Sequence, residues 1–232
     1  MSSSASILSV LQQHQSDFHP VVPFDPARDK LYAFDFTEKN TDLTTDQIAD
    51  TERFANYINQ TLRLANARYG IGGYGENRTL YARSRHFGGD EPRRLHLGID
   101  IWGPAGTKVM SPMNAVVHSF AFNNNDSDYG ATLILTHNLD GIGFHTLYGH
   151  LSLNSLKNLY EGKNIQAGEV IAEFGMRFEN GNWPPHLHFQ LIGDLQGWKG
   201  DYPGVCKFSE KQQWLDSCPD PDLVLQLLQY AG

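Results

Sequence analysis

Residues 115–148 read AVVHSFAFNNNDSDYGATLILTHNLDGIGFHTLY, and this stretch decides the fold. Runs rich in valine, isoleucine, leucine, phenylalanine and threonine alternate in it with clusters of asparagine, aspartate and glycine, which is the pattern of strands joined by turns. No helical segment of crossover length separates the runs, so the strands are predicted to pair antiparallel. The same texture continues outward: the predicted strands are 108–110, 115–122, 132–137, 144–148, 170–174 and 187–192, with turns at 123–128 and 138–141.

The segment before this β-rich core is predicted to be helical and irregular. Thr44 and Gln47 form a capping-box pair, and apolar residues then recur at three- and four-residue steps, which predicts a helix over about 45–69. The prolines within 18–36 favour an irregular segment laid over a surface. The glycine-rich residues 70–75 favour a flexible connector, because they lack the GxGxxG spacing and the preceding strand of a phosphate-binding loop.

The C-terminal end is helical again, with helices predicted over 209–216 and after Pro219. The sequence therefore predicts three parts: an N-terminal helical and irregular extension over 1–85, a β-rich domain over 86–200, and a helical tail over 201–232. The predicted fold class is α+β, mainly β with flanking helices and an antiparallel β-sandwich core.

Composition excludes several classes of protein. The 232 residues suffice for a full hydrophobic core. The 26 acidic and 18 basic side chains give a net charge of −8, which attracts neither nucleic acid nor anionic membranes. No stretch approaches the ~20 apolar residues of a membrane span. The first basic residue is Arg28, so no signal peptide is visible. We therefore expect a cytoplasmic protein. An atypical start site or export route would instead make the protein periplasmic or extracellular. Cys206 and Cys218 are too few for a disulfide framework, so they are interpreted as reduced thiols or one optional bridge.

Five residues in three short motifs indicate a metal site. His96 and Asp100 form an HxxxD motif inside an apolar run. His150 follows a predicted strand, and His186 and His188 form an HxH motif. Each motif alone can arise by chance in a chain with 10 histidines, so the interpretation depends on their order and context.

Geometry limits how the HxxxD motif can bind an ion. Zinc ligand atoms lie about 2.0–2.2 Å from the metal, whereas four residues of extended strand span about 13 Å. The chain between His96 and Asp100 must therefore bend, and Gly98 permits the bend. A second HxxxD pair, His86 and Asp90, flanks a glycine loop instead of lying in an apolar run, which makes it the weaker metal candidate.

The HxH motif adds a third ligand. Its histidines lie on one face of a strand about 6.6 Å apart, so one can bind the ion while the other faces a water on it. Two histidines and one carboxylate leave the fourth tetrahedral position open, which is typical of catalytic zinc. Such zinc lowers the pKa of water toward about 7 and polarises carbonyl groups, so amide hydrolysis is the expected chemistry. Because no HExxH motif supplies a glutamate beside the ligands, a histidine, whose ordinary pKa is near 6.5, is expected to be the general base.

These ordered motifs, with the entry segment 103–107, resemble the lysostaphin-type (LytM-like) zinc endopeptidases, which cut peptide bonds in bacterial cell-wall peptidoglycan. The resemblance covers about residues 93–193 and implies a core related to the barrel-sandwich hybrid. It also implies zinc ligands at His96, Asp100 and His188. It assigns the general base and the transition-state hydrogen-bond donor to His150 and His186, without deciding which residue has which role.

Upstream of the first ligand, Tyr81 and His86 are predicted to line the substrate groove. The leading interpretation is a zinc metalloendopeptidase acting on peptidoglycan or related peptides. One alternative is a non-catalytic zinc-binding relative that serves as a binding or regulatory module. Another is an intracellular amide hydrolase on a non-wall substrate, favoured by the missing export signal and by the acidic charge, since wall polymers are usually anionic.

Overall fold

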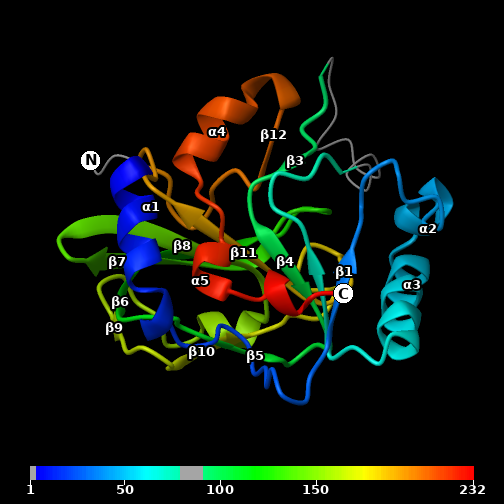
Figure 1. Cartoon of the computed structure of the whole chain (residues 1–232), viewed down its shortest axis with the longest axis horizontal. Helices are drawn as coiled ribbons and strands as arrows, with labels where there is room; N and C mark the ends of the chain where they lie inside the picture. Colours follow the sequence, from blue (N-terminus) through cyan, green and yellow to red (C-terminus); the bar gives the residue numbers. More distant parts are fainter. Residues whose placement is uncertain (1–3, 79–90) are drawn as a thin grey trace.

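The main element of the structure is an eight-stranded sheet (Figure 1). The computed structural model describes residues 4–78 and 91–232. In chain order the strands of this sheet are β1 (Leu31–Phe34), β2 (Tyr69–Gly72), β4 (Ile99–Trp102), β6 (Ala115–Asn123), β7 (Gly130–Leu139), β8 (Ile142–Leu151), β9 (Asn164–Ile165) and β11 (His186–Ile192). Their spatial order is β1-β2-β4-β11-β8-β7-β6-β9. β1 and β2 pair in parallel, and the other neighbours pair antiparallel.

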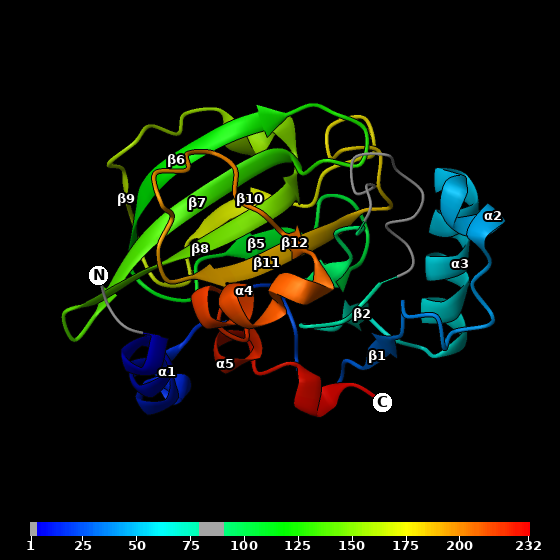
Figure 2. The ribbon, with the colours of Figure 1, turned by 90° about the horizontal axis from the view of Figure 1, so that it is seen from above.

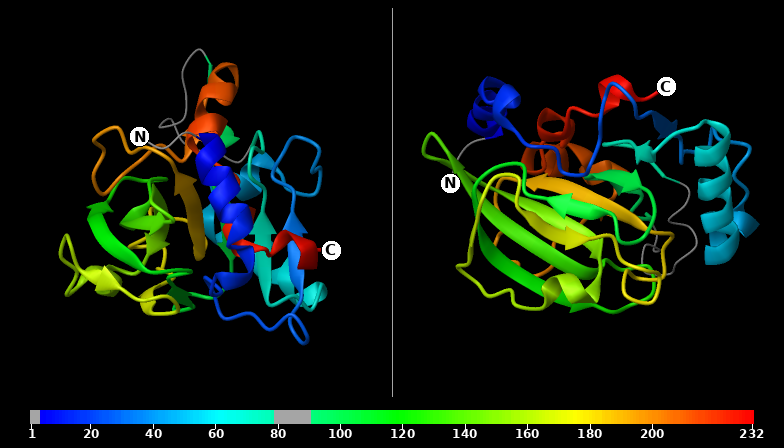
Figure 3. Two further views of the ribbon diagram at one scale, coloured as in Figure 1. Left: turned by 60° about the vertical axis from the view of Figure 1, so that its left-hand side comes forward. Right: turned by 90° about the horizontal axis from the view of Figure 1, so that it is seen from below.

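Two small sheets complete the β architecture. One pairs β5 (Lys108–Met110) with β10 (Val170–Glu173), and the other pairs β3 (Leu95–His96) with β12 (Val205–Cys206). The β5–β10 pair lies against one face of the large sheet (Figures 2 and 3). Apolar side chains of both sheets share one buried cluster between them. This packing of sheet on sheet is the main hydrophobic core of the molecule.

Both faces of the central strands of the large sheet are covered, which explains the apolar run in β7. Leu133 and Leu135 point into the core beneath β5 and β10. Ile134 points the other way, into a second cluster with Leu147 and Tyr202. Successive side chains of a strand alternate between faces, so a strand buried on both sides shows no polar alternation.

The predicted fold class is confirmed: the core is mainly β, with helices at its flanks. All six predicted strands are present. The segment 108–110 coincides with β5, and the other five differ from prediction only at their ends.

The predicted helix over 45–69 is instead two helices, α2 (Thr45–Ala49) and α3 (Thr51–Leu64). The capping box at Thr44 is confirmed. Asp50 explains the break. Its side chain accepts hydrogen bonds from the backbone N–H groups of Glu52 at 2.9 Å and Arg53 at 3.1 Å. An aspartate in this role starts a new helix.

Two predictions for the N-terminal segment are wrong. Residues 18–36 were expected to be irregular and residues 70–75 to be a flexible connector, yet they contain β1 and most of β2. A Cβ atom on Gly70 would lie 2.1 Å from Cε2 of Phe34, so the missing side chain lets the aromatic ring cross the neighbouring strand. The glycines therefore serve close strand packing here instead of flexibility.

The other helices lie outside the sheets. They are α1 (Ser4–Gln13), α4 (Lys211–Ser217) and α5 (Asp222–Leu225), with 3-10 turns at Gln15–Asp17, Leu153–Leu156, Phe208–Glu210 and Leu228–Tyr230. The views in Figure 3 place α1 beside α5, although they come from opposite ends of the sequence.

Among the described residues, no helix has the length and apolar character needed to cross a membrane. Both cysteines are buried free thiols. The three domain ranges 1–85, 86–200 and 201–232 remain predictions.

Candidate metal centre and active site

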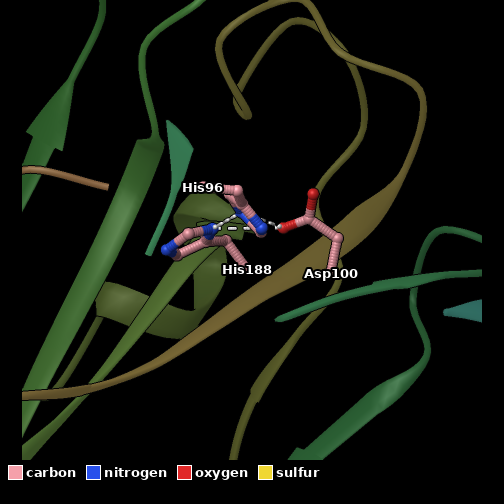
Figure 4. A group of neighbouring side chains, drawn as sticks. All are labelled: His96, Asp100 and His188. Atoms are coloured by element: carbon pink, nitrogen blue, oxygen red, sulfur yellow. Dashed lines mark hydrogen bonds and ion pairs between the residues drawn. The ribbon is translucent and has the colours of Figure 1, made fainter. Parts of the chain in front are cut away.

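Three strands bring His96, Asp100 and His188 together, as Figure 4 shows. His96 ends β3, Asp100 lies in β4 after a bend, and His188 lies directly opposite Asp100 in the antiparallel pair of β4 and β11. The bend is at Gly98, as the sequence predicted. A Cβ atom there would lie 2.6 Å from Cε1 of His188, so glycine also leaves the space that this imidazole occupies.

The three side chains form a small buried triangle. His96 Nε2 lies 3.0 Å from His188 Nδ1 and 3.3 Å from Asp100 Oδ1. The distance between His188 Nδ1 and Asp100 Oδ1 is 3.1 Å. Each residue is at most 3% exposed. In a tetrahedral site with bonds of 2.0–2.2 Å, neighbouring ligand atoms lie roughly 3.4 Å apart. The triangle is therefore close to the size that one bound ion requires.

The hydrogen-bond partners of the two imidazoles fix which nitrogens face the centre of this triangle. His96 Nδ1 donates to the Gly73 carbonyl at 3.0 Å. His188 Nε2 donates to Gln190 Oε1 at 2.9 Å, and the amide nitrogen of Gln190 donates to the Pro203 carbonyl at 3.2 Å. In the neutral rings, His96 Nε2 and His188 Nδ1 then carry lone pairs. Two lone pairs beside a carboxylate oxygen suit a shared cation, and the outer partners hold the rings in place for it.

The carboxylate of Asp100 is bound on its other side by Arg78. Nη1 of Arg78 donates to Asp100 Oδ2 at 2.5 Å, and its Nε donates to Glu76 at 2.6 Å. Desolvation alone would raise the pKa of Asp100, but His96 and the guanidinium of Arg78 hold this pKa well below its usual range. Burial lowers the pKa of His96 to about 4, and the charge of Arg78 adds to the effect. The site therefore offers an ionised carboxylate and neutral imidazole at neutral pH.

His150 and His186 lie next to this triangle with their rings close together. Their ring centroids are 4.1 Å apart. His150 Nδ1 donates to the carbonyl of Asn180, and His186 Nδ1 donates to the carbonyl of Pro184, each at 2.8 Å. Each neutral ring therefore keeps a lone pair on Nε2, the atom that can take up a proton.

Burial is the main influence on the basicity of both rings. It lowers the pKa of His186 to about 4. It also lowers the pKa of His150 well below the usual value, and the neighbouring His186 adds to this shift. Both imidazoles are consequently neutral at neutral pH, which is the form that accepts a proton.

The backbone of His150 has an uncommon conformation. Its φ angle is +62°, in the left-handed region that residues with a side chain rarely enter. The backbone N–H of His150 donates to the carbonyl of Tyr129 at 2.9 Å, which helps to hold the chain in this form. Conformations of this kind recur at functional sites, where the surrounding structure imposes them.

A cavity of about 140 Å³ connects these groups. Its wall includes Asp100, His150, His186 and His188. Much of the remaining wall is aromatic, with Trp102, Tyr129, Trp183, Trp198 and Tyr202. A cavity lined by aromatic rings around a few convergent polar groups is the usual form of a small-molecule or peptide site.

The structure thus brings all five predicted motif residues to one place. The predicted groove residues Tyr81 and His86 lie outside the described residues. Sequence reasoning missed Arg78, Gln190 and Trp102. Gln190 and Trp102 each follow a predicted ligand by two residues on the same strand, so strand periodicity carried a signal for both. No residue near Arg78 in the sequence indicated its contact with Asp100.

Comparison with known proteins finds similar peptidases. Residues 94–199 match the model of peptidase family M23. The DD-carboxypeptidase/endopeptidase Mpg of Neisseria meningitidis serogroup B is 36% identical over 97 residues, which are 42% of this chain and 20% of that protein. Mpg of Neisseria gonorrhoeae is 34% identical over the same length. The chain therefore spans about a fifth of the length of these relatives.

Solved structures of peptidases are also similar. The catalytic domain of lysostaphin from Staphylococcus simulans matches with 23% identity and a TM-score of 0.44, over 74% of this chain and 97% of that domain. A zinc-containing peptidase from Vibrio cholerae matches with 28% identity and a TM-score of 0.34, over 42% of this chain and 27% of that one. Over residues 94–199 the chain is therefore similar to the peptidases of family M23.

Proposed function

We propose that this protein is a zinc metalloendopeptidase that hydrolyses a peptide bond in peptidoglycan or a related peptide. The observation that carries the proposal is the triangle of His96 Nε2, His188 Nδ1 and Asp100 Oδ1, whose atoms lie within 4.8 Å of one another. Three protein ligands leave a tetrahedral position open for a reactant, whereas structural zinc sites use four. A zinc ion held there supplies Lewis acidity, which lowers the pKa of water and polarises a carbonyl group.

The proposed roles of His150 and His186 are supported by the hydrogen bonds of their Nδ1 atoms. Because each Nδ1 donates to a backbone carbonyl, only Nε2 can exchange a proton with a reactant. A ring of this kind donates a hydrogen bond from Nε2 only after it has accepted a proton there. One histidine therefore takes the proton from water as general base. The protonated form can stabilise the oxyanion or deliver the proton to the leaving amine.

The peptidoglycan assignment is supported by the family and by the names of the Neisseria relatives, which are carboxypeptidases and endopeptidases. The net charge of −8 gives no electrostatic attraction to anionic wall polymers. Recognition is therefore expected to depend on contacts inside the aromatic cavity.

The test combines metal analysis with substrate hydrolysis. Purified protein is assayed for bound metal, and amine release is followed with peptidoglycan fragments and with pentaglycine. One zinc ion per chain and new amines from either substrate are expected, and the His188→Ala chain should give neither. Zinc without turnover would support the non-catalytic binding module instead. Turnover of non-wall amides alone would support the intracellular hydrolase.

A further inference from the structure

We propose that helix α3 is a positioning element of the active site, which orients His186 through Trp102 and His150 through the loop of residues 175–183. The inference rests on the proposed function, since it assumes that these two rings move protons. Helix α3 lies at the edge of the sheet (Figures 1 and 2), outside the segment that matches the peptidase family.

The first connection runs through Trp102. Its indole stacks on the His186 imidazole with a centroid distance of 3.9 Å and an interplanar angle of 13°. The two residues are also direct partners in the register of β4 and β11, so strand pairing sets the rings face to face. With Nδ1 of His186 bound to the Pro184 carbonyl, the stacked indole restricts the remaining tilt of the imidazole.

Two phenylalanines hold Trp102 from the side of α3. Phe54, in the first half of α3, contacts the indole edge-on at a centroid distance of 5.6 Å. Phe36 contacts it at 5.5 Å and also packs on Phe54 at 5.8 Å. All three side chains are at most 1% exposed. The indole therefore cannot rotate away from His186 without displacing a packed helix.

The second connection runs through the first two residues of α3. The Thr51 hydroxyl donates to the carbonyl of Asn182 at 2.9 Å, and Glu52 forms an ion pair with Arg177 at 2.9 Å. Both partners lie in the loop that carries Asn180, whose carbonyl accepts the hydrogen bond from His150 Nδ1. The N-terminus of α3 thus anchors the loop that orients the second histidine.

One helix consequently contacts the supports of both rings. Packing alone would make α3 a source of stability, and its loss would then affect folding more than turnover. A positioning role predicts a different result, because a misplaced proton acceptor slows the reaction in a chain that is still folded and still binds zinc.

The test uses the zinc-loaded full chain and three variants. Trp102→Leu removes the stacked ring, Trp102→Phe restores an aromatic face, and Tyr32→Leu is the matched control. Tyr32 packs against the same aromatic cluster through Phe34, at a centroid distance of 5.0 Å, and among the described residues no ring stacking joins it to Trp102. Zinc content, thermal unfolding, kcat and KM are measured for each, with the substrate that the unmodified chain hydrolyses.

For Trp102→Leu we expect kcat to fall by about 10²-fold with KM and zinc content nearly unchanged. The phenylalanine variant should regain most of the rate. Tyr32→Leu should lower the unfolding temperature while keeping kcat. Equal kcat in the two leucine variants, at a temperature where both are folded, would overturn the proposal. If Trp102→Leu does not fold, Phe54→Leu replaces it with the same expected split between kcat and KM.

A readout without substrate separates this proposal from the proposed function. Histidine ring signals in ¹H–¹⁵N NMR spectra report the tautomer and mobility of His186. Loss of the indole should broaden or double these signals in Trp102→Leu and leave them single in Tyr32→Leu. If the unmodified chain binds zinc but hydrolyses nothing, the proposed function fails, and the NMR comparison still decides whether Trp102 orients the ring.

Discussion

His137 on the one hand, and His150 and His186 on the other, are buried histidines of the same sheet. They differ in the number of hydrogen-bond partners that their rings have. His137 in β7 donates or accepts at both nitrogens, with the Asn114 carbonyl at 3.0 Å and the Thr146 hydroxyl at 2.8 Å. His150 and His186 each have a backbone partner for Nδ1 only, among the residues that the structure describes.

Burial and basicity do not separate the two groups. Burial lowers the pKa of His137 and the pKa of His186 to about 4 in both cases. The comparison teaches that a buried histidine with a low pKa is not thereby a catalytic one. A better criterion for a histidine that transfers protons is a ring with one nitrogen held by a hydrogen bond and the other facing a cavity.

The largest expected effect follows from removing a ligand. His188→Ala deletes one corner of the triangle, so both bound zinc and hydrolysis should be lost. Metal analysis by mass spectrometry and the amine-release assay measure the two losses. Substitution of His137 by glutamine serves as the control and should keep the zinc. A His188→Ala chain that retained stoichiometric zinc would contradict the ligand assignment.

The next largest effect concerns a ring that does not bind the ion. His150→Ala should keep most of the zinc and lose rate by a factor of about 10²–10⁴, as is typical when a general base is removed. Single-turnover kinetics at saturating substrate measures this loss. Unchanged turnover would show that His150 is not the base and would leave that role to His186.

His137 should affect stability and not rate. Its folded pKa of about 4 lies below the ordinary value of 6.5, so the unfolded chain binds the proton first as the pH falls. Stability is therefore unaffected above pH 6.5 and decreases between pH 6.5 and about 4, by up to ~3 kcal/mol for this residue.

Urea unfolding of the metal-free chain at pH 7 and at pH 4.5 measures this decrease. His137→Gln should reduce the difference between the two pH values, while the zinc-loaded variant keeps its turnover at neutral pH. An equal difference in both chains would mean that His137 does not contribute to the acid sensitivity.

The smallest expected effect concerns the outer partner of a ligand. Gln190→Leu leaves His188 without its main acceptor, so zinc affinity should fall by about 10- to 100-fold. Gln190→Glu keeps an acceptor oxygen and should retain most of the affinity. Competition with a chromogenic chelator measures both values, and equal affinities would show that Gln190 does not fix the tautomer of His188.

Local sequence predicted the parts of the molecule that local chemistry determines. The six core strands, the capping box at Thr44 and the bend at Gly98 each depend on residues within a few positions. The five motif residues were recognisable because their order and flanks resemble a known family, and the structure brings them together.

The sequence could not predict what long-range pairing determines. The glycines of 70–75 indicated a connector, but pairing with β1, far along the chain, makes Gly70 and Gly72 part of a strand. The contacts of Arg78 with Asp100 and of Trp102 with His186 likewise depend on tertiary structure. The break at Asp50 was readable in principle, because an aspartate inside a helical pattern can start a new helix.

The left-handed backbone at His150 has an evolutionary consequence. Glycine and asparagine enter that region more easily than histidine, so under the proposed function selection for turnover would maintain a residue that selection for folding alone would replace. In a lineage that has lost its substrate, this position should drift early, while the proposed ligands His96, Asp100 and His188 should persist wherever a bound metal stabilises the fold.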